Sequence, residues 1–249
     1  SDNSSGNLKY GGDWILENTG DDIQSVYFTE DIEYYKYLLS EPVELGTGIS
    51  AGQFDNRYED IGSPPYLIFS EGLTYIPHSG GSNPNSFEAN SNLHAIIIGS
   101  TITDIGSRAF NGCSNLTSVV FRSNSLVETF NYAVFQNVPI TEINFPENTH
   151  TLDLQCFSGT SLNYINLTNT ITTHIGKRAF RSNSSLTRVI MSNITSVLND
   201  TFYKCTNLSQ ITMYEGLMDP GTTSFNAWSS NDFYNLPNSL EITLMPQNN

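Results

Sequence analysis

The chain has 249 residues, of which 38% are hydrophobic and only 14% are charged, and its formal net charge is −15. With 10 Lys and Arg against 25 Asp and Glu, it lacks the basic surface that neutralises phosphates, so we exclude nucleic acid as a partner. No run of about 18 apolar residues occurs, so the sequence predicts no transmembrane segment.

Residues 1–44 are interpreted as a polar tether followed by an N-terminal cap. The opening SDNSSGN resembles, in composition, the tether that follows the lipid-bearing cysteine of bacterial lipoproteins. That resemblance implies a lipid anchor upstream of residue 1 and an outer-membrane lipoprotein. Residues 25–28 are expected to form a strand and residues 31–40 a short helix. The alternative is that the first 65 residues form a small separate domain.

Residues 45–70 fit a degenerate first repeat, because Ile49 lies five residues before Phe54 and the segment 65–69 follows as its strand. The same stretch contains GISAG, which matches the G-x-S-x-G pattern of serine hydrolases. That motif needs a preceding strand and a following helix, whereas a Gly-containing loop precedes it here. A hydrolase that uses Ser50 is therefore the remotest function considered.

Downstream, one pattern recurs around a phenylalanine every 22–25 residues, with a longer last step of 31 residues. It is clearest in ITDIGSRAFNGCSNLTSVVF (102–121) and ITTHIGKRAFRSNSSLTRVIM (171–191). In the clearest units, a small or thiol residue follows the phenylalanine after three positions, Leu after six, and two alternating apolar residues after nine and eleven. The repeats are centred on Phe87, Phe110, Phe135, Phe157, Phe180, Phe202 and Phe233.

Each unit is expected to contribute one short strand and one tight turn to a shared core. The alternating apolar pair points to one face of a strand. The segment SRAFNGC is too short for an independent helix, so it predicts a helical or 3-10 turn. A single unit cannot bury its apolar face, and stacking of neighbouring units closes the core.

This pattern resembles the BspA-type leucine-rich repeat over roughly residues 66–245. The resemblance rests on Ile102, Ile105, Gly106, Ala109, Phe110, Cys113, Leu116, Val119, Phe121 and their counterparts in residues 171–191. It implies an α/β fold, a right-handed leucine-rich-repeat solenoid over residues 45–249, with one short strand per repeat. It also implies a bacterial or protist surface protein that binds host or neighbouring-cell proteins. The long lead-ins before Phe87 and Phe233 depart from the pattern and predict irregular curvature at both ends.

The cysteines and histidines are expected to be structural or solvated. Cys113, Cys156 and Cys205 fall in alternate repeats, so strands stacked ~4.8 Å apart would hold them ~10 Å or more apart. A disulfide needs Cα atoms within about 7 Å, so we expect three free thiols that fill the core. The histidines occupy no matching positions in adjacent repeats, and we expect no metal and no cofactor.

A partner of a solenoid usually binds the exposed face of its strand ladder. Residues between and before the core pairs define that face: Ile97, Val120, Glu142, Asn144, Tyr164, Asn166, Arg188 and Ile190. Tyr and Arg are enriched at binding hot spots, and a contiguous apolar patch often marks an interface. Two structural explanations stay open, namely that β-branched residues favour strands or that the cap folds over Ile68 and Ile97.

We therefore expect a non-enzymatic, cell-surface or secreted protein-binding module, with the adhesin-like role that the resemblance implies. Its partner would be a protein of the host matrix or of a neighbouring cell. The alternative is a structural spacer or scaffold that presents another domain of a longer precursor. Because an open solenoid end could pair edge to edge, we expect a monomer or a weak dimer.

Overall fold

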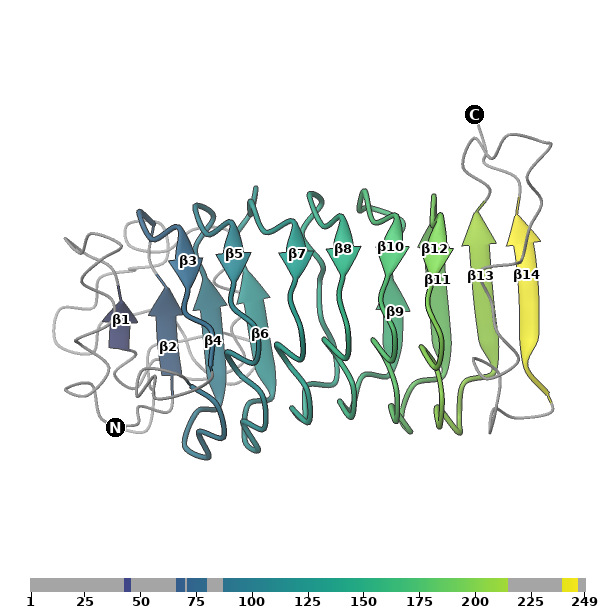
Figure 1. Cartoon of the computed structure of the whole chain (residues 1–249), viewed down its shortest axis with the longest axis horizontal. Helices are drawn as coiled ribbons and strands as arrows, with labels where there is room; N and C mark the ends of the chain where they lie inside the picture. The colour runs from purple at the N-terminus through teal and green to yellow at the C-terminus, as the bar shows by residue number, and fades with distance from the viewer. Residues whose placement is uncertain (1–42, 46–65, 70, 80–86, 215–238, 246–249) are drawn as a thin grey trace, which may run out of the picture.

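The computed structural model describes residues 43–45, 66–69, 71–79, 87–214 and 239–245, and Figure 1 shows them as a row of stacked coils. The described residues form fourteen strands and no helix. Several predictions lie outside the described residues: most of the tether and cap, the strand at 25–28, the helix at 31–40, Ser50, Phe54 and Phe233.

The longer strands lie along one side of the row, with parallel neighbours that follow one another in successive coils (Figure 1). One four-stranded sheet contains β1 (Val43–Leu45), β2 (Tyr66–Phe69), β4 (Ala95–Ile98) and β6 (Ser118–Phe121). A second contains β9 (Tyr164–Asn166), β11 (Arg188–Ser192), β13 (Gln210–Tyr214) and β14 (Glu241–Met245). The strands expected after the central phenylalanines are confirmed, apart from the coil between β6 and β9.

A second ladder of very short strands was not anticipated. It contains β3 (Tyr75–Ile76), β5 (Asp104–Ile105), β7 (Thr129–Phe130), β8 (Thr151–Leu152), β10 (His174–Ile175) and β12 (Ser196–Val197), all parallel. The expectation of one strand per repeat is therefore corrected, because most coils contribute two. In every short strand the second residue is buried, so this ladder closes another side of the same core.

The segments around the phenylalanines are linked turns, so helical or 3-10 turns are not found in the described residues. In the coil of Phe110, the N–H groups of Arg108, Phe110 and Gly112 donate to carbonyls of the following coil at 2.8, 3.0 and 2.8 Å. Arg108 and Gly112 have φ angles of 60° and 72°, and the same alternation recurs around Phe135 and Phe157. These amides form hydrogen bonds to another coil, whereas a helical turn would require them to bond to carbonyls of their own coil.

The repeated phenylalanines form a continuous column through the core, as the sequence predicted. Phe110 and Phe135 stack with their ring centres 5.4 Å apart, and Phe157 and Phe180 with theirs 5.8 Å apart. The column runs without a break from Phe87 to Phe202, and its rings are almost fully buried. One ring from each of these coils therefore joins the column, and Phe69, Phe130 and Phe145 add further rings to the same core.

In three coils, the residue three positions after the phenylalanine bonds to the preceding coil. The thiol of Cys113 donates to the Phe87 carbonyl at 2.9 Å, and that of Cys205 donates to the Phe180 carbonyl at 3.1 Å. At the same position Asn183 donates through Nδ2 to the Phe157 carbonyl at 2.9 Å. Cysteine and asparagine therefore serve as donors at this position in these three coils, whereas the buried Val138 fills it after Phe135 without a donor.

All three cysteines are free and buried, as expected. Burial raises the pKa of Cys113 and of Cys205 to about 12, and burial also raises the pKa of Cys156 well above its usual value. Because the thiolate is the reactive form, we expect a disulfide-exchange reagent to label the folded protein at least about 100-fold more slowly than the unfolded protein. The labelling rate is measured by counting the modified thiols as a function of time, with and without denaturant. Fast labelling of even one thiol in the folded state would contradict the buried positions.

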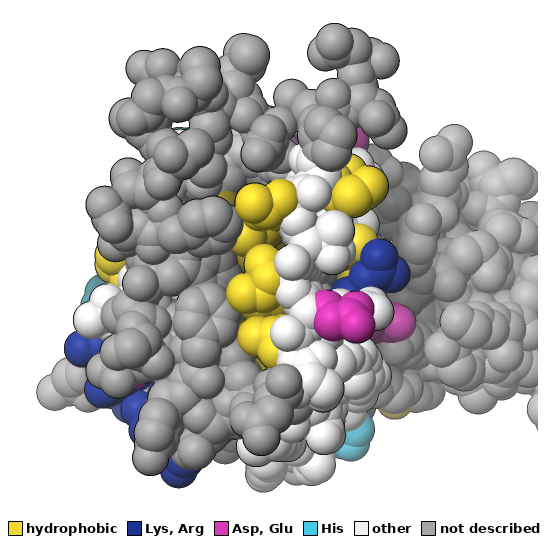
Figure 2. Space-filling view, turned by 90° about the vertical axis from the view of Figure 1, so that its right-hand side faces the viewer, with side chains coloured by type: hydrophobic (Ala, Val, Ile, Leu, Met, Phe, Trp, Pro, Cys, Tyr) yellow, Lys and Arg dark blue, Asp and Glu magenta, His cyan; other side chains and the backbone are white. Residues whose placement is uncertain are grey.

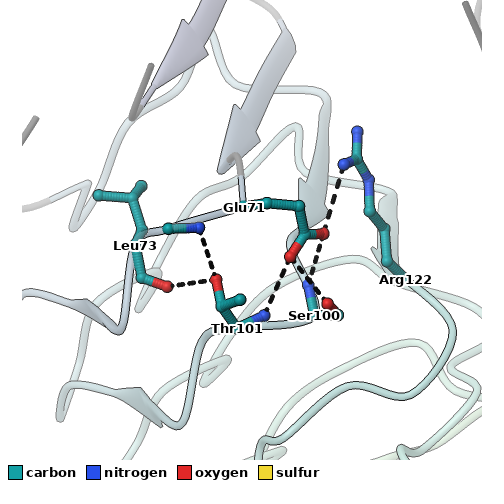
Figure 3. A network of polar contacts seen from close by, with 6 residues as sticks. Glu71, Leu73, Ser100, Thr101 and Arg122 are labelled. Carbon is teal, nitrogen blue, oxygen red and sulfur yellow. Dashed lines mark hydrogen bonds and ion pairs between the residues drawn. The ribbon is translucent and has the colours of Figure 1, made fainter. Parts of the chain in front are cut away.

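Glu71 links three coils at the N-terminal part of the described stack (Figure 3). Its carboxylate accepts bonds from the Ser100 N–H and Oγ at 2.9 and 2.7 Å and from the Thr101 N–H at 3.2 Å. Arg122 of the next coil lies 3.4 Å from the same carboxylate. Partial burial raises the pKa of Glu71, but the bonds from Ser100 and Arg122 outweigh it and hold this pKa below its ordinary value.

Replacing Glu71 by glutamine is expected to lower stability near neutral pH and to make no difference in strong acid. The folded-state pKa is depressed, so the contribution of the carboxylate is complete above the unfolded pKa of about 4.3 and is lost as the pH falls through the folded value. Urea unfolding of wild type and Glu71→Gln at about pH 7 and about pH 2 measures the difference. Glu147→Gln is the control, since the exposed Glu147 side chain accepts no hydrogen bond within the described residues. If Glu71→Gln lowers stability by the same amount at both pH values, the carboxylate of Glu71 does not stabilise the fold in the way described.

Candidate functional site

The outer face of the first long-stranded sheet, turned away from the phenylalanine column, is apolar and largely closed. Ala95 is fully buried and Ile97 is only 6% exposed, and both pack with Tyr66, Ile68 and Val120 in a second hydrophobic cluster. Ile97, which the sequence analysis placed on the exposed face, is therefore largely shielded from solvent in this structure. Its outward position on the strand was right, but its neighbours bury it. Val120 is half-buried in the same cluster.

The strand ladder is interrupted between the two long-stranded sheets. Within the described residues, Ile143, Asn144 and Phe145 belong to no strand and their amides form no hydrogen bonds to adjacent coils. Pro146 contributes to this break. At the corresponding position one coil earlier, Arg122 donates its N–H to the Ile98 carbonyl at 3.0 Å. Pro146 has no N–H to donate. The interruption leaves these amides without partners in the adjacent coils that the structure describes, and Asn144 between the buried Ile143 and Phe145 is exposed.

Beyond the interruption, the outer face becomes polar. Arg188 lies directly beside Tyr164 in the register of β9 and β11, and Ile190 lies beside Asn166. The guanidinium carbon of Arg188 is 6.0 Å from the centre of the Tyr164 ring, within the range of a cation–π contact. Tyr164 is 40% exposed, and Arg188 and Asn166 are exposed while Ile190 is half-buried.

We call Glu142, Asn144, Tyr164, Asn166, Arg188 and Ile190 the polar strand surface. It combines an aromatic ring, a cation, a carboxylate and two amides on three successive coils. Asn166 is held in place because its Oδ1 accepts bonds from the Thr168 N–H at 3.0 Å and the Thr168 hydroxyl at 2.8 Å. Six of the eight candidate residues thus lie on three successive coils, and Ile97 and Val120 lie on the two coils before them.

The polar strand surface presents groups that can form hydrogen bonds and aromatic contacts. Among the described residues, no three His, Cys, Asp or Glu side chains gather closely enough to hold a metal ion. None of the described residues belongs to a helix that could span a lipid bilayer. The polar strand surface offers hydrogen-bond donors, acceptors and one ring without an activated nucleophile beside a base, which is the arrangement that nucleophilic catalysis needs.

Comparison with known protein families identifies the same repeat that the sequence pattern indicated. A family model described as BspA type leucine rich repeat region matches residues 81–192 and 128–244, with 6 copies. A leucine-rich repeat protein from Bacteroides ovatus ATCC 8483 is similar in structure with a TM-score of 0.50 and 18% identity, over 72% of this chain and 46% of that protein. The leucine-rich repeat protein of T. pallidum matches with a TM-score of 0.50 and 18% identity, over 72% of this chain and 81% of that protein.

These structural similarities concern the fold alone, because the identities are low. The matched part spans less than half the length of the Bacteroides ovatus protein. A search of curated proteins found no match.

Proposed function

The chain belongs to the BspA-type leucine-rich repeat family, and from this membership we propose that it is a non-catalytic protein-binding module of a cell-surface or secreted protein. The partner would be a protein of the host matrix or of a neighbouring cell, which makes the role adhesin-like. The observation that carries this proposal is the pairing of Tyr164 and Arg188 on an accessible strand face. Tyr and Arg supply a disproportionate share of the energy at protein interfaces.

The polar strand surface supports a protein partner in a second way. Its exposed amides and the backbone groups of the interrupted coil can donate to and accept from an irregular polypeptide surface. Protein interfaces carry about one hydrogen bond per 100–200 Å², so a surface with both an aromatic anchor and a polar surround suits them.

Replacing both Tyr164 and Arg188 by alanine is expected to weaken partner binding by about 100-fold or more while leaving thermal unfolding unchanged. Wild type and variant are used to capture proteins from host-matrix and neighbouring-cell surface extracts, and a protein captured only by wild type is then titrated against both. The matched control is Tyr203→Ala with Arg181→Ala, which removes another cation–π pair, 5.0 Å apart, from the turns of the stack.

Equal affinity of the wild type and of the Tyr164 and Arg188 variant would exclude this face as the binding site. Loss of affinity in the Tyr203 and Arg181 control alone would move the site to the turns. If wild type captures no protein from any extract, the scaffold function becomes the better account, since a passive spacer needs no partner on its strand face.

A further inference from the structure

The C-terminal end of the described stack exposes an apolar strand. β14 is the outermost strand of its sheet within the described residues, and all five of its side chains are exposed. Ile242, Leu244 and Met245 are 42%, 48% and 39% exposed. Figure 2 looks onto this end of the row and shows a column of hydrophobic side chains at the surface, with polar and acidic side chains beside it.

Two of these side chains belong, by register, to the core. Ile242 pairs with Ile211, which is fully buried, and Leu244 pairs with Met213, which packs against the core cluster. Side chains alternate across a strand, so Ile242 and Leu244 face the inner side while Thr243 faces outward. The core side of the sheet therefore continues to β14, and within the described residues no further strand pairs with it.

The backbone of β14 has the features of a strand that accepts a partner. A free strand edge offers a row of unpaired N–H and C=O groups, and proteins usually protect such edges with charges, prolines or bulges. Glu241, at the first position, is the single charged residue in β14, and Pro246 follows immediately after its end. The central part of the strand carries no such protection.

The sequence of β14 is complementary to itself in the reverse direction. Read antiparallel about Thr243, the sequence EITLM sets Ile242 opposite Leu244 and Thr243 opposite a second Thr243. All four core-side residues then meet on one face, and the Thr–Thr pair is a favourable cross-strand contact on the other. A two-fold contact uses one surface twice, so this internal match favours a second copy over an unrelated protein.

We propose that β14 pairs antiparallel with β14 of a second copy about a two-fold axis through Thr243, closing the two open cores against each other. The charges are compatible with this contact: each Glu241 lies opposite Met245, and the two carboxylates stand about 13 Å apart along the strands, beyond the Debye length of roughly 8 Å. The contact is short compared with a standard interface, so the dimer is expected to dissociate in the micromolar range.

Cysteine cross-linking tests the register of this pairing. Residues opposite each other in an antiparallel pair have Cα atoms about 4.5–5.5 Å apart, within reach of a disulfide. Thr243→Cys is therefore expected to form a disulfide-linked dimer on mild oxidation, and Glu241→Cys is not. A mixture of Glu241→Cys and Met245→Cys proteins should cross-link to each other. The native thiols do not interfere, because they are buried. Equal cross-linking of Thr243→Cys and Glu241→Cys would overturn the register.

Sedimentation of the unmodified chain tests the dimer itself. Wild type is expected to dimerise at tens of micromolar, and Thr243→Lys to weaken the dimer by at least about 10-fold, because two like charges then face each other at the axis. The control Thr212→Lys places the same charge one strand inward on the same face and should leave the dimer intact. A wild type that stays monomeric at several hundred micromolar, or equal effects of both variants, would refute the proposal. Neither result bears on the polar strand surface.

Discussion

Replacing Phe157 by alanine is expected to lower the free energy of unfolding by about 3–5 kcal/mol. This ring is fully buried at the middle of the phenylalanine column. Its centre lies 5.6 Å from that of Phe135 and 5.8 Å from that of Phe180, and it also contacts Phe130 and Phe145 at 5.1 and 5.5 Å. The cavity that alanine would leave cannot be filled easily, because the coils on both sides are fixed by hydrogen bonds between coils.

Urea unfolding followed by circular dichroism measures this loss. Tyr132→Ala is the control, because Tyr132 is 37% exposed and its truncation should change the free energy of unfolding by less than about 1 kcal/mol. Since a coil in a repeat stack packs mainly against its neighbours, the Phe157 variant is also expected to uncouple the two halves and to broaden the transition. A loss as small as that of the control would show that the column does not carry the stability of the stack.

Replacing Gly106 by alanine is expected to destabilise the fold by about 3 kcal/mol or more, at the upper end for overpacking. A Cβ added at Gly106 would lie 2.2 Å from the His78 amide nitrogen, 2.5 Å from the His78 Cα and 2.7 Å from the Pro77 carbonyl carbon. These are backbone atoms of the preceding coil and cannot rotate away. Gly106 also donates its N–H to the Ile76 carbonyl at 2.8 Å, so the two coils cannot separate without losing that bond.

Gly112→Asn is the matched control for this steric effect. Gly112 has a φ of 72°, yet a Cβ there would meet nothing closer than 3.8 Å. Asn137 occupies the corresponding place in the next coil with a φ of 57°, so asparagine tolerates this backbone. Thermal unfolding is expected to place the control within about 1 kcal/mol of wild type and the Gly106 variant far below it. Similar melting temperatures for the two variants would disprove the close approach at Gly106.

The stacking of the coils could be predicted from the sequence because one strong signal repeats. The spacing of the phenylalanines showed the length of the repeat. The alternating apolar pairs predicted the long strands and their register, including the pairing of Val189 with Ile211. The short ladder could not be foreseen, because strands of two residues such as His174–Ile175 are too short to show alternation. The turns were misjudged because left-handed residues such as Arg108 and Gln155 carry no glycine signature.

The candidate site was predicted in part for similar reasons. Tyr164 and Arg188 could be placed side by side because both stand immediately before a core pair in successive repeats. The burial of Ile97 depends on neighbours from other coils, which a single repeat does not reveal. The interrupted ladder did have a signal, since Pro146 follows the core residue Phe145 and cannot donate a ladder bond. An open solenoid end was expected, but the exposure of Ile242 and Leu244 on β14 was not, because both match the pattern of buried residues.

Residue-resolved amide hydrogen exchange tests most directly the claim that bonds between coils hold a rigid stack, with one accessible interruption at the candidate site. The amides of Phe110, Phe135, Phe157 and Phe180 each donate to the next coil and are expected to exchange only through global unfolding. Those of Ile143 and Asn144 are expected to exchange orders of magnitude faster under the same conditions. Fast exchange at the phenylalanine amides, or equal protection at Ile143 and Asn144, would contradict this account.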